Sequence, residues 1–300
     1  MVTPLRRTAL PPPGPHGGDG PAIARALGWP LDDVLDLSLS LNPCAPDIAG
    51  LAGRHLGSLQ HYPDAATATR LLADTIGVDP ARVVLTNGGA EAIALVRDRF
   101  GGTVSAEPEF SLHPRAGFGP RWRSDPHNPS GALAVADARA DVWDEAFYPL
   151  ATGRWTAGRP ALATIGSLTK VFACPGLRLG YLIAGDGADE IRRNEQTEWS
   201  VNSLALALVP ELLASAELDK WARVITELRG QLVDLLVTHG LTPQRSDANW
   251  VLVEAPGLRD RLARRGIAVR DCTSFGLPRH VRIAVPDERG LERLQAALAR

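Results

Sequence analysis

Short apolar segments alternate with helical ones from Arg82 onwards, and this alternation limits the possible folds more than any other feature of the chain. A strand is predicted over each of the segments "RVVLT", "GTVSA", "ADVW", "ALATIG" and "LRLGYLIAG", and a helix over "AEAIALVRDRF" after the first of them. Strands of this kind that alternate with helices predict a mostly parallel sheet covered on both faces, which is an α/β fold.

The two ends of the chain differ from this central part. The start, through about Pro15, is rich in proline and poor in large apolar residues, which predicts an extended or mobile arm. The stretch from Ser203 to His239 carries apolar side chains at helical spacing and is predicted to be helical. The segments "NWVLVEA", "LRDRLARRG", "IAVRDC" and "HVRIAV", followed by a terminal helix, have an α+β pattern, so we expect a second, smaller domain.

The charge balance argues against nucleic acid and membranes as partners. The 32 basic and 34 acidic residues are mixed along the chain and leave a net charge of −2, so no basic stripe is present. No apolar run approaches the ~18 residues of a membrane-spanning helix, and the N-terminus lacks the apolar core of a secretory signal. We therefore expect a cytoplasmic protein with a small-molecule partner. Three widely spaced cysteines, in no C-x-x-C pair, indicate neither disulfides nor a zinc site.

Three short motifs place polar groups where predicted strands end, which is the usual ligand-binding edge of an open α/β sheet. In "LTNGGAEAI" a strand meets Gly88 and Gly89 before a helix, which leaves backbone N–H groups at a positive helix end for a phosphate. In "DPHNPSG" a turn would hold the amide of Asn128. In "DVWDEAF" Asp144 ends an apolar run and needs a cationic or hydrogen-bonding partner. Taken alone, each motif also has a plain structural explanation as a turn or a cap.

The segment "GSLTKVFACPGLRLGY" contains Lys170, one of only two lysines in the chain. Small polar residues precede Lys170, apolar residues follow it, and Arg178 lies beyond a Pro-Gly turn. An amine in an apolar pocket beside a fixed guanidinium becomes nucleophilic near neutral pH and can form a Schiff base with an aldehyde, which a guanidinium cannot do. Together with the phosphate loop, Asn128 and Asp144, this setting favours a catalytic lysine over an ordinary surface residue.

The motifs "SLTK", "PGLRLGY", "NGGAEAI", "HNPSG" and "DEAF" resemble those of the fold type I enzymes that depend on pyridoxal 5′-phosphate (PLP), the aspartate-aminotransferase-like group. The resemblance extends from His16 nearly to the C-terminus. It implies a PLP-binding large domain with a mostly parallel sheet over residues 60–202, a linking helix and small α+β domain over 203–300, and an arm with part of the small domain over 1–59.

Other segments point to a branch of that group. The segments "HGGDG", "LSLSLNP", "HYPD", "WSVNSLA", "DANWVLVE", "VRDCTSF" and "RIAV" are most similar to the threonine-phosphate decarboxylases of cobalamin biosynthesis, whose nearest relatives are the histidinol-phosphate aminotransferases.

The resemblance implies a role for each matching residue around the cofactor. Lys170 would bind the cofactor aldehyde covalently, Asp144 would keep the pyridine nitrogen protonated, and Asn128 would hydrogen-bond the ring hydroxyl oxygen. Phe110, in "EPEF", would stack on the ring face. The residues that would hold the cofactor phosphate are Gly89, Ala90, Ser167 and Arg178.

The same resemblance implies a phosphorylated amino acid as substrate and a homodimer as the active unit. Tyr62, in "HYPD", would reach the phosphate of the neighbouring subunit, and Arg282, in "HVRIAV", would bind the substrate carboxylate. Weaker candidates for the substrate side, each with an equally good structural role, are His16, Asn42, Asn202 and Arg270. No metal site is implied.

Several positions depart from the pattern of these relatives. Phe147 stands where many have tyrosine, which favours the decarboxylase-like branch, while Ser40 and Gly166 replace the usual asparagine and arginine. Residues 111–124 and 132–143 occupy intervals in which relatives place a strand and two helices, so we expect a trimmed large domain. Three functions remain open: decarboxylation of O-phospho-L-threonine to (R)-1-aminopropan-2-yl phosphate, transamination of the histidinol-phosphate type, and a trimmed paralogue without catalytic activity.

Overall fold

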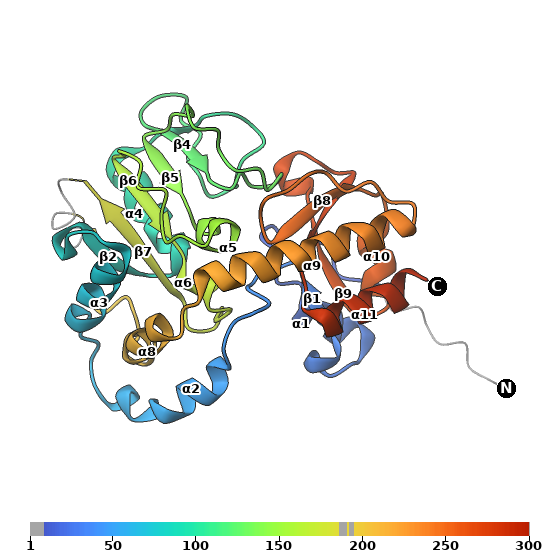
Figure 1. The fold of residues 1–300 in the computed structure, drawn as a ribbon, viewed down its shortest axis with the longest axis horizontal. Helices are drawn as coiled ribbons and strands as arrows, with labels where there is room; N and C mark the ends of the chain where they lie inside the picture. Colours follow the sequence, from blue (N-terminus) through green and yellow to red (C-terminus); the bar gives the residue numbers. More distant parts are fainter. Residues whose placement is uncertain (1–8, 186–190, 192–194, 300) are drawn as a thin grey trace. The chain divides into compact units, whose positions relative to one another are not determined.

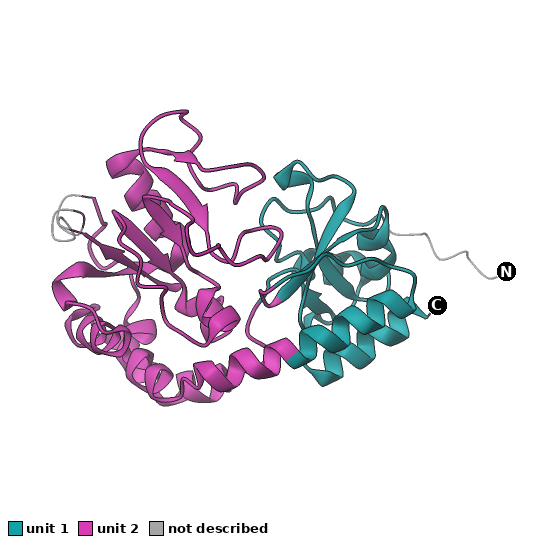
Figure 2. Ribbon diagram, turned by 45° about the horizontal axis from the view of Figure 1, so that its top comes forward, with its two compact units in different colours: residues 1–40, 227–246, 250–300 teal, residues 41–226, 247–249 magenta. Residues whose placement is uncertain are grey.

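The computed structural model describes residues 9–185, 191 and 195–299, which form two compact units (Figure 1). Unit 1 combines residues 1–40, 227–246 and 250–300, and unit 2 combines residues 41–226 and 247–249 (Figure 2). These units do not coincide with the ranges 1–59, 60–202 and 203–300, which stay a prediction of the domain boundaries. Within the described part of the chain, no helix has both the length and the apolar content needed to cross a membrane.

Unit 2 is built on a six-stranded sheet in the order β2-β7-β6-β5-β4-β3. Strand β7 is antiparallel to both of its neighbours and the other pairs are parallel, which confirms the mostly parallel sheet predicted from the sequence. The strands are β2 (Val83–Asn87), β3 (Thr103–Val104), β4 (Arg121–Ser124), β5 (Val142–Asp144), β6 (Ala163–Gly166) and β7 (Leu179–Ala184).

Side chains along the strands alternate between the two faces of this sheet, and helices cover the apolar side chains on both faces. Val84 and Leu182 pack with α4 on one face, whereas Leu85 and Tyr181 pack on the other with α3, α8 and the start of α9. The helices of this unit are α2 (Ile48–Arg54), α3 (Ala66–Ile76), α4 (Gly88–Phe100), α5 (Tyr148–Thr152), α6 (Leu168–Val171), α8 (Ser203–Ala214), the first part of α9 (Leu218–Thr238), and the 3-10 turns η2 (Leu56–Gln60) and η3 (Pro80–Arg82).

Residues 105–120 and 125–141 contain no helix, which confirms that the large domain is trimmed. Buried polar side chains hold these segments instead. Glu109 accepts hydrogen bonds from the N–H and the hydroxyl of Ser124 at 2.9 and 2.6 Å. The fully buried Asp125 pairs with Arg159 at 2.7 Å, and the Arg159 guanidinium lies 4.3 Å from the ring centroid of Trp143. Ion pairs and hydrogen bonds thus fix the strand ends in the two intervals where we expect relatives to have helices.

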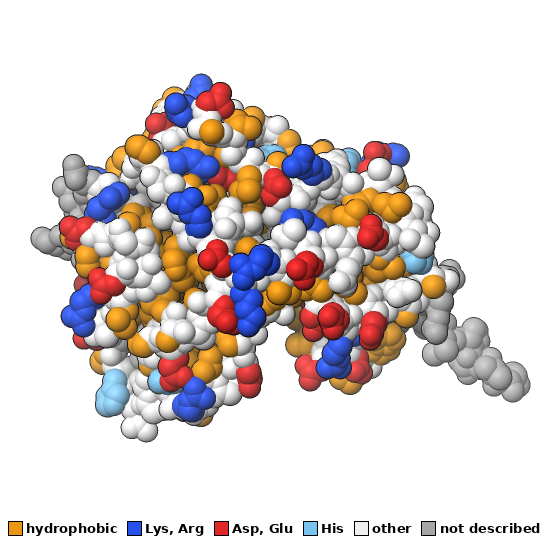
Figure 3. All heavy atoms as spheres, in the orientation of Figure 1, with side chains coloured by type: hydrophobic (Ala, Val, Ile, Leu, Met, Phe, Trp, Pro, Cys, Tyr) orange, Lys and Arg blue, Asp and Glu red, His pale blue; other side chains and the backbone are white. Residues whose placement is uncertain are grey.

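Unit 1 contains a four-stranded sheet in the order β1-β9-β10-β8, with β1 parallel to β9 and the other pairs antiparallel. This is the smaller α+β domain that the sequence predicted. Acidic and basic side chains are interspersed on the face of the molecule drawn in Figure 3. The elements are β1 (Leu35–Leu37), β8 (Trp250–Glu254), β9 (Ile267–Asp271), β10 (His280–Ala284), α1 (Gly20–Leu27), α10 (Leu258–Ala263), α11 (Glu288–Leu298), and the 3-10 turns η1 (Leu31–Asp33) and η4 (Thr273–Phe275).

Candidate active site

The Asp144 carboxylate is held by two hydrogen bonds at the end of β5. Its Oδ1 accepts the backbone N–H of Ala146 at 3.0 Å, and its Oδ2 lies 3.1 Å from Nε2 of His113, whose side chain is fully buried. The His113 ring packs against Phe110 and Trp122, with ring centroids 5.7 and 5.4 Å apart. The sequence predicted that Asp144 needs a partner, and His113 is that partner. Sequence reasoning did not find it, because one histidine in a segment without regular structure gives no signal.

Lys170 lies on the single-turn helix α6, directly after β6. Its Nζ is 5.4 Å from the ring centroid of the buried Phe147. The main chain around it is fixed by Asn42, whose N–H donates to Lys170 O at 3.2 Å and whose side-chain amide donates to Val171 O at 2.8 Å. The Oδ1 of Asn42 accepts the N–H of Cys44 at 2.9 Å. The buried Asn42 therefore supports the main chain beside the lysine, and its predicted role toward substrate stays a prediction.

The start of α4 lies against the exposed side chain of Arg178. Gly88, its first residue, has φ +77°, and a Cβ there would lie 2.5 Å from Nη2 of Arg178. A Cβ on Gly180 would lie 2.6 Å from the backbone of both Gly88 and Gly89, so glycine is needed for β7 to approach the helix end. A guanidinium held against the positive end of a helix is unfavourable by itself, and an anion between the two relieves that repulsion.

Two more predicted phosphate ligands lie at or near this helix end. Ser167 is buried, and a Cβ on Gly89 would be 3.9 Å from its Cβ, so the two residues are neighbours. Ala90 follows in the first turn of α4 and is exposed. Packing requires glycine at position 166, because a Cβ on Gly166 would overlap the ring of the buried Tyr181. The arginine usual at that position in relatives has no room here.

Asn128 is buried in the turn that the sequence predicted after β4. The turn is closed by a hydrogen bond from the N–H of Gly131 to His127 O at 2.6 Å. The His127 ring joins this turn to the segment that carries Phe110, with Nδ1 2.7 Å from Ser130 Oγ and Nε2 2.8 Å from Pro108 O. One histidine thus ties together the loops of two predicted cofactor ligands, which local sequence patterns did not reveal.

Tyr62 and Asn202 lie elsewhere on unit 2. Tyr62 is 79% exposed and contacts Trp199, which is 58% exposed, with tilted rings whose centroids are 4.6 Å apart. Asn202 caps α8, because its Oδ1 accepts the N–H of Ala205 at 2.8 Å, and its Nδ2 donates to Leu177 O at 2.9 Å. A contact of Tyr62 with a second subunit and a contact of Asn202 with substrate stay predictions.

The remaining candidates, Arg282, Arg270 and His16, belong to unit 1. Arg282 and Arg270 are both buried and face each other in the register of β10 and β9. The Arg282 guanidinium lies 4.8 Å from the ring centroid of Trp250. Burial lowers the pKa of Arg282 to about 10, and the charge of Arg270 adds to this effect. Burial, followed by the charge of Arg270, also lowers the pKa of His16. Of these three candidates, Arg270 and Arg282 are therefore the buried positive charges, whereas His16 is exposed.

Comparison with known proteins identifies this architecture. The structure of a histidinol-phosphate aminotransferase from Sinorhizobium meliloti in complex with PLP superposes with a TM-score of 0.79, over 99% of this chain and 96% of that one, at 18% identity. An L-threonine-O-3-phosphate decarboxylase from Porphyromonas gingivalis gives a TM-score of 0.72 over 89% and 98% of the two chains, at 22% identity. The fold is therefore that of the type I PLP enzymes.

Sequence comparison gives the family. The model of aminotransferase class I and II matches residues 125–298, and the chain belongs to this family. It is 28% identical to a histidinol-phosphate aminotransferase of Halorubrum lacusprofundi, over 92% of this chain and 91% of that one. It is 29% identical to a threonine-phosphate decarboxylase of Salmonella typhimurium, over 94% and 95%. The cofactor is PLP, and the anion site at α4 together with the carboxylate of Asp144 fits its phosphate and its ring nitrogen.

Proposed function

We propose that the chain is a PLP-dependent lyase that decarboxylates O-phospho-L-threonine to (R)-1-aminopropan-2-yl phosphate, a step of cobalamin biosynthesis. The observation that carries this proposal is the pair of buried guanidinium groups, Arg270 and Arg282, on neighbouring strands. Buried charges of one sign are costly unless ions of opposite sign accompany them. A substrate with both a carboxylate and a phosphate supplies such ions, and Arg282 would bind the carboxylate in the forked geometry that arginine favours.

Decarboxylation is supported by Phe147. Its ring is the apolar neighbour of the Lys170 amine, at the position where many relatives have a tyrosine. A phenyl ring offers no hydroxyl to the amine or to the cofactor. The likeness to the Salmonella decarboxylase over nearly all of both chains supports the same choice. Transamination of histidinol phosphate is the second candidate, because several relatives carry that name.

The side chains of unit 2 supply contacts for each part of the cofactor. When bound, PLP supplies an aldehyde that links to an amine and a ring that draws electrons from the bonds at the substrate Cα. His113 orients Asp144 toward its task at the ring nitrogen. The proposed contacts are Arg178, Ser167, Gly89 and Ala90 to the phosphate, Asp144 to the ring nitrogen, Asn128 to the ring hydroxyl, Phe110 to the ring face and Lys170 to the aldehyde.

Lys170 would also move the proton at the substrate Cα. Decarboxylation ends when a proton is delivered to Cα in place of CO₂, whereas transamination begins when a proton is removed from Cα. Which bond at Cα breaks is set by how the enzyme orients the substrate through its carboxylate and phosphate. The two hydrogen bonds from Asn42 fix the main chain at residues 170–171, so the position of the amine depends mainly on its own side-chain torsions.

We also propose that the active unit is a homodimer. Tyr62 and Trp199 form an exposed aromatic pair, and hollows of about 260 and 390 Å³ beside them share Leu206 as a lining residue. Exposed apolar surface of this kind marks interaction sites. Sedimentation velocity tests this point: we expect a dimer for the wild type and a larger monomer fraction for Trp199→Asp. A wild type that sediments only as a monomer would contradict it.

Two parallel incubations of purified enzyme with added PLP test the function itself. One contains O-phospho-L-threonine, and the other contains histidinol phosphate with 2-oxoglutarate. We expect CO₂ and the aminopropanol phosphate in the first, without any need for a 2-oxo acid. Glutamate formed in the second with no CO₂ in the first would replace the decarboxylase by the aminotransferase. Inactivity in both with PLP bound would indicate the non-catalytic paralogue.

A further inference from the structure

Thr169, the residue directly before Lys170, uses its hydroxyl within the protein interior. The side chain is only 3% exposed. Its Oγ1 accepts the backbone N–H of Leu179 at 3.0 Å and donates to Leu179 O at 3.1 Å. The main-chain oxygen of Thr169 accepts the N–H of Cys174 at 3.1 Å. One hydroxyl therefore satisfies both main-chain groups of a buried residue that lies beyond the Pro-Gly turn.

Leu179 is the first residue of β7 and precedes the stretch of that strand that pairs with β6. This pairing starts at Tyr181, opposite Gly166, which is the last residue of β6. Leu179 also pairs with Asn87 of β2 in the register of the sheet. The Thr169 hydroxyl thus takes the place of a strand neighbour at the start of β7, where β6 has already ended.

The start of β7 lies between two groups that are assigned to the cofactor phosphate. Arg178, directly before Leu179, has a φ of +55°, in the left-handed region that residues other than glycine rarely adopt. Such a conformation persists only where the surroundings hold it. Gly180, directly after Leu179, lies so close to the start of α4 that its Cβ would be 2.6 Å from backbone atoms of Gly88 and Gly89. The hydrogen bonds of Leu179 hold the main chain between these two contacts.

We propose that Thr169 is a positioning residue that sets the distance between the two ends of the PLP site. One end is the Lys170 amine, which would take the aldehyde, and the other is the Arg178 guanidinium, which would take the phosphate. The hydroxyl connects the turn that carries Lys170 to the strand start that follows Arg178. The proposal rests on the proposed function for these two cofactor contacts, whereas the hydrogen bonds of Thr169 are contacts within unit 2.

A ligand that must reach both ends distinguishes this role from a general effect on folding. PLP binds through its aldehyde and its phosphate together, so each contact raises the effective concentration of the other. Pyridoxal carries the aldehyde without the phosphate, and inorganic phosphate supplies only the anion. If Thr169 sets the distance between the two ends, loss of its hydroxyl weakens the binding of PLP and spares the binding of the two separate halves.

Titration of the full-length apoprotein with these three probes tests the proposal. Thr169→Val keeps the shape of the side chain and removes the hydroxyl. We expect its dissociation constant for PLP to rise roughly 10- to 100-fold, as for a small misplacement of groups that must act together. Its affinities for pyridoxal, followed by absorbance, and for inorganic phosphate, followed by phosphorus NMR, should change less than about threefold. Thr169→Ser, which keeps the hydroxyl, should bind all three probes like the wild type.

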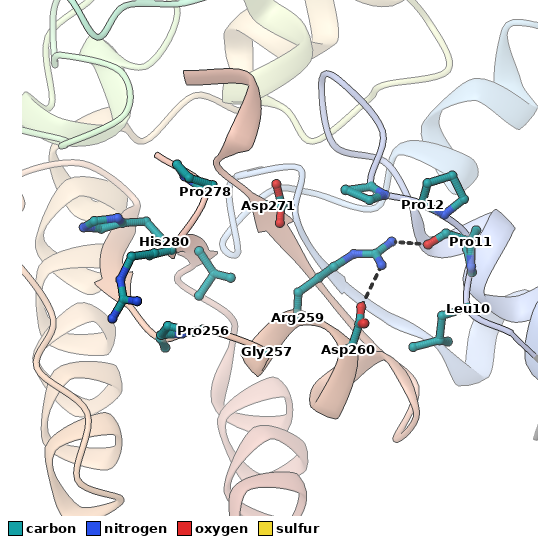
Figure 4. A pocket seen from close by; sticks show the side chains of 14 residues that line it. Leu10, Pro11, Pro12, Pro256, Gly257, Arg259, Asp260, Asp271, Pro278 and His280 are labelled. Carbon is teal, nitrogen blue, oxygen red and sulfur yellow. Dashed lines mark hydrogen bonds and ion pairs between the residues drawn. The ribbon is translucent and has the colours of Figure 1, made fainter. Parts of the chain in front are cut away.

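A variant in unit 1 controls for lost stability. Figure 4 shows the buried Arg259 donating to Pro11 O, at 2.8 Å, beside a cavity of about 320 Å³ that both residues line. Arg259→Met also removes a hydrogen bond from a buried side chain to the main chain, so it should lower the unfolding temperature and leave the PLP affinity unchanged. An equal loss of PLP affinity in Arg259→Met and Thr169→Val would show that lost stability explains both, and would overturn the proposal.

Two results with Thr169→Val would also overturn it: a wild-type affinity for PLP, or equal losses for all three probes. If this variant does not fold, Thr169→Cys carries the same titrations, because a thiol is only a weak donor and acceptor. Failure of the proposed function is recognised separately. Borohydride that attaches no PLP to Lys170 in the wild type would refute the assigned lysine, whereas PLP on Lys170 with unchanged PLP affinity in Thr169→Val would refute the positioning role alone.

Discussion

Alanine at Gly88 is expected to damage cofactor binding much more than folding. A Cβ at this position would lie 2.5 Å from Nη2 of Arg178, the far end of a flexible side chain, so the guanidinium moves away and the fold survives. The positive φ of +77° costs an alanine ~1–2 kcal/mol of folding stability. Loss of one hydrogen bond to a charged group costs ~1.5–3 kcal/mol, so the dissociation constant for PLP should rise roughly 10- to 150-fold.

The neighbouring glycine provides the control for this prediction. Gly89→Ala places its Cβ 3.9 Å from Ser167 Cβ, an ordinary contact, and its φ is not in the left-handed region. Replacement of a helical glycine by alanine gains up to ~1 kcal/mol, so this variant should unfold at an equal or higher temperature and bind PLP almost normally. Titration of each apoprotein with PLP and thermal unfolding without PLP separate the two effects. Equal affinities of the two variants would refute an anion site between Arg178 and α4.

Two further substitutions test the assigned roles of Arg282 and His113. Arg282→Ala should lower kcat/KM by ~30-fold to several-thousand-fold with little change in PLP affinity, because removal of one partner of a desolvated charge pair costs ~2–5 kcal/mol. The exposed Arg279, replaced by alanine, is the control. An unchanged kcat/KM in Arg282→Ala would show that another group binds the carboxylate. His113→Leu fills the same buried position with an apolar side chain and removes the hydrogen bond to Asp144, so kcat should fall ~10-fold or more while the protein stays folded. A wild-type kcat in this variant would show that His113 has no part in orienting Asp144.

Local pattern predicted the elements that carry the cofactor residues. The run from β2 into α4 follows from an apolar segment, two glycines and a helical repeat, and β5, β6 and β7 follow from short apolar segments between turns. Strand β4 was missed because "RWRS" contains a single apolar residue, Trp122, between two arginines. The Trp122 side chain is fully buried. The strand pairs with β3 and β5, and the buried Glu109 from another segment accepts hydrogen bonds from Ser124 at its end.

Contacts between distant parts of the chain could not be predicted in the same way. His113 meets Asp144 across 31 residues, and Asn42 reaches Val171 across 129. Arg270 holds carbonyls of the arm 255 and 256 residues away. Periodicity and turn chemistry describe neighbours in sequence, whereas these contacts depend on which strands become adjacent in the sheet. The residue types of the site were therefore found from sequence, while their partners came from the structure.

The binding of PLP by Lys170 can be tested directly, because the chain contains one other lysine, Lys220. Lys220 is exposed on α9 and paired with Glu217 at 2.9 Å, so it serves as an internal control. Borohydride reduction of the PLP-loaded protein, followed by peptide mass spectrometry, locates the attached cofactor. We predict the added mass on the peptide with Lys170 in the wild type and in Lys220→Ala, and none in Lys170→Ala. Cofactor attached to Lys220 in the wild type, or any reducible cofactor in Lys170→Ala, would show that Lys170 is not the residue that binds PLP.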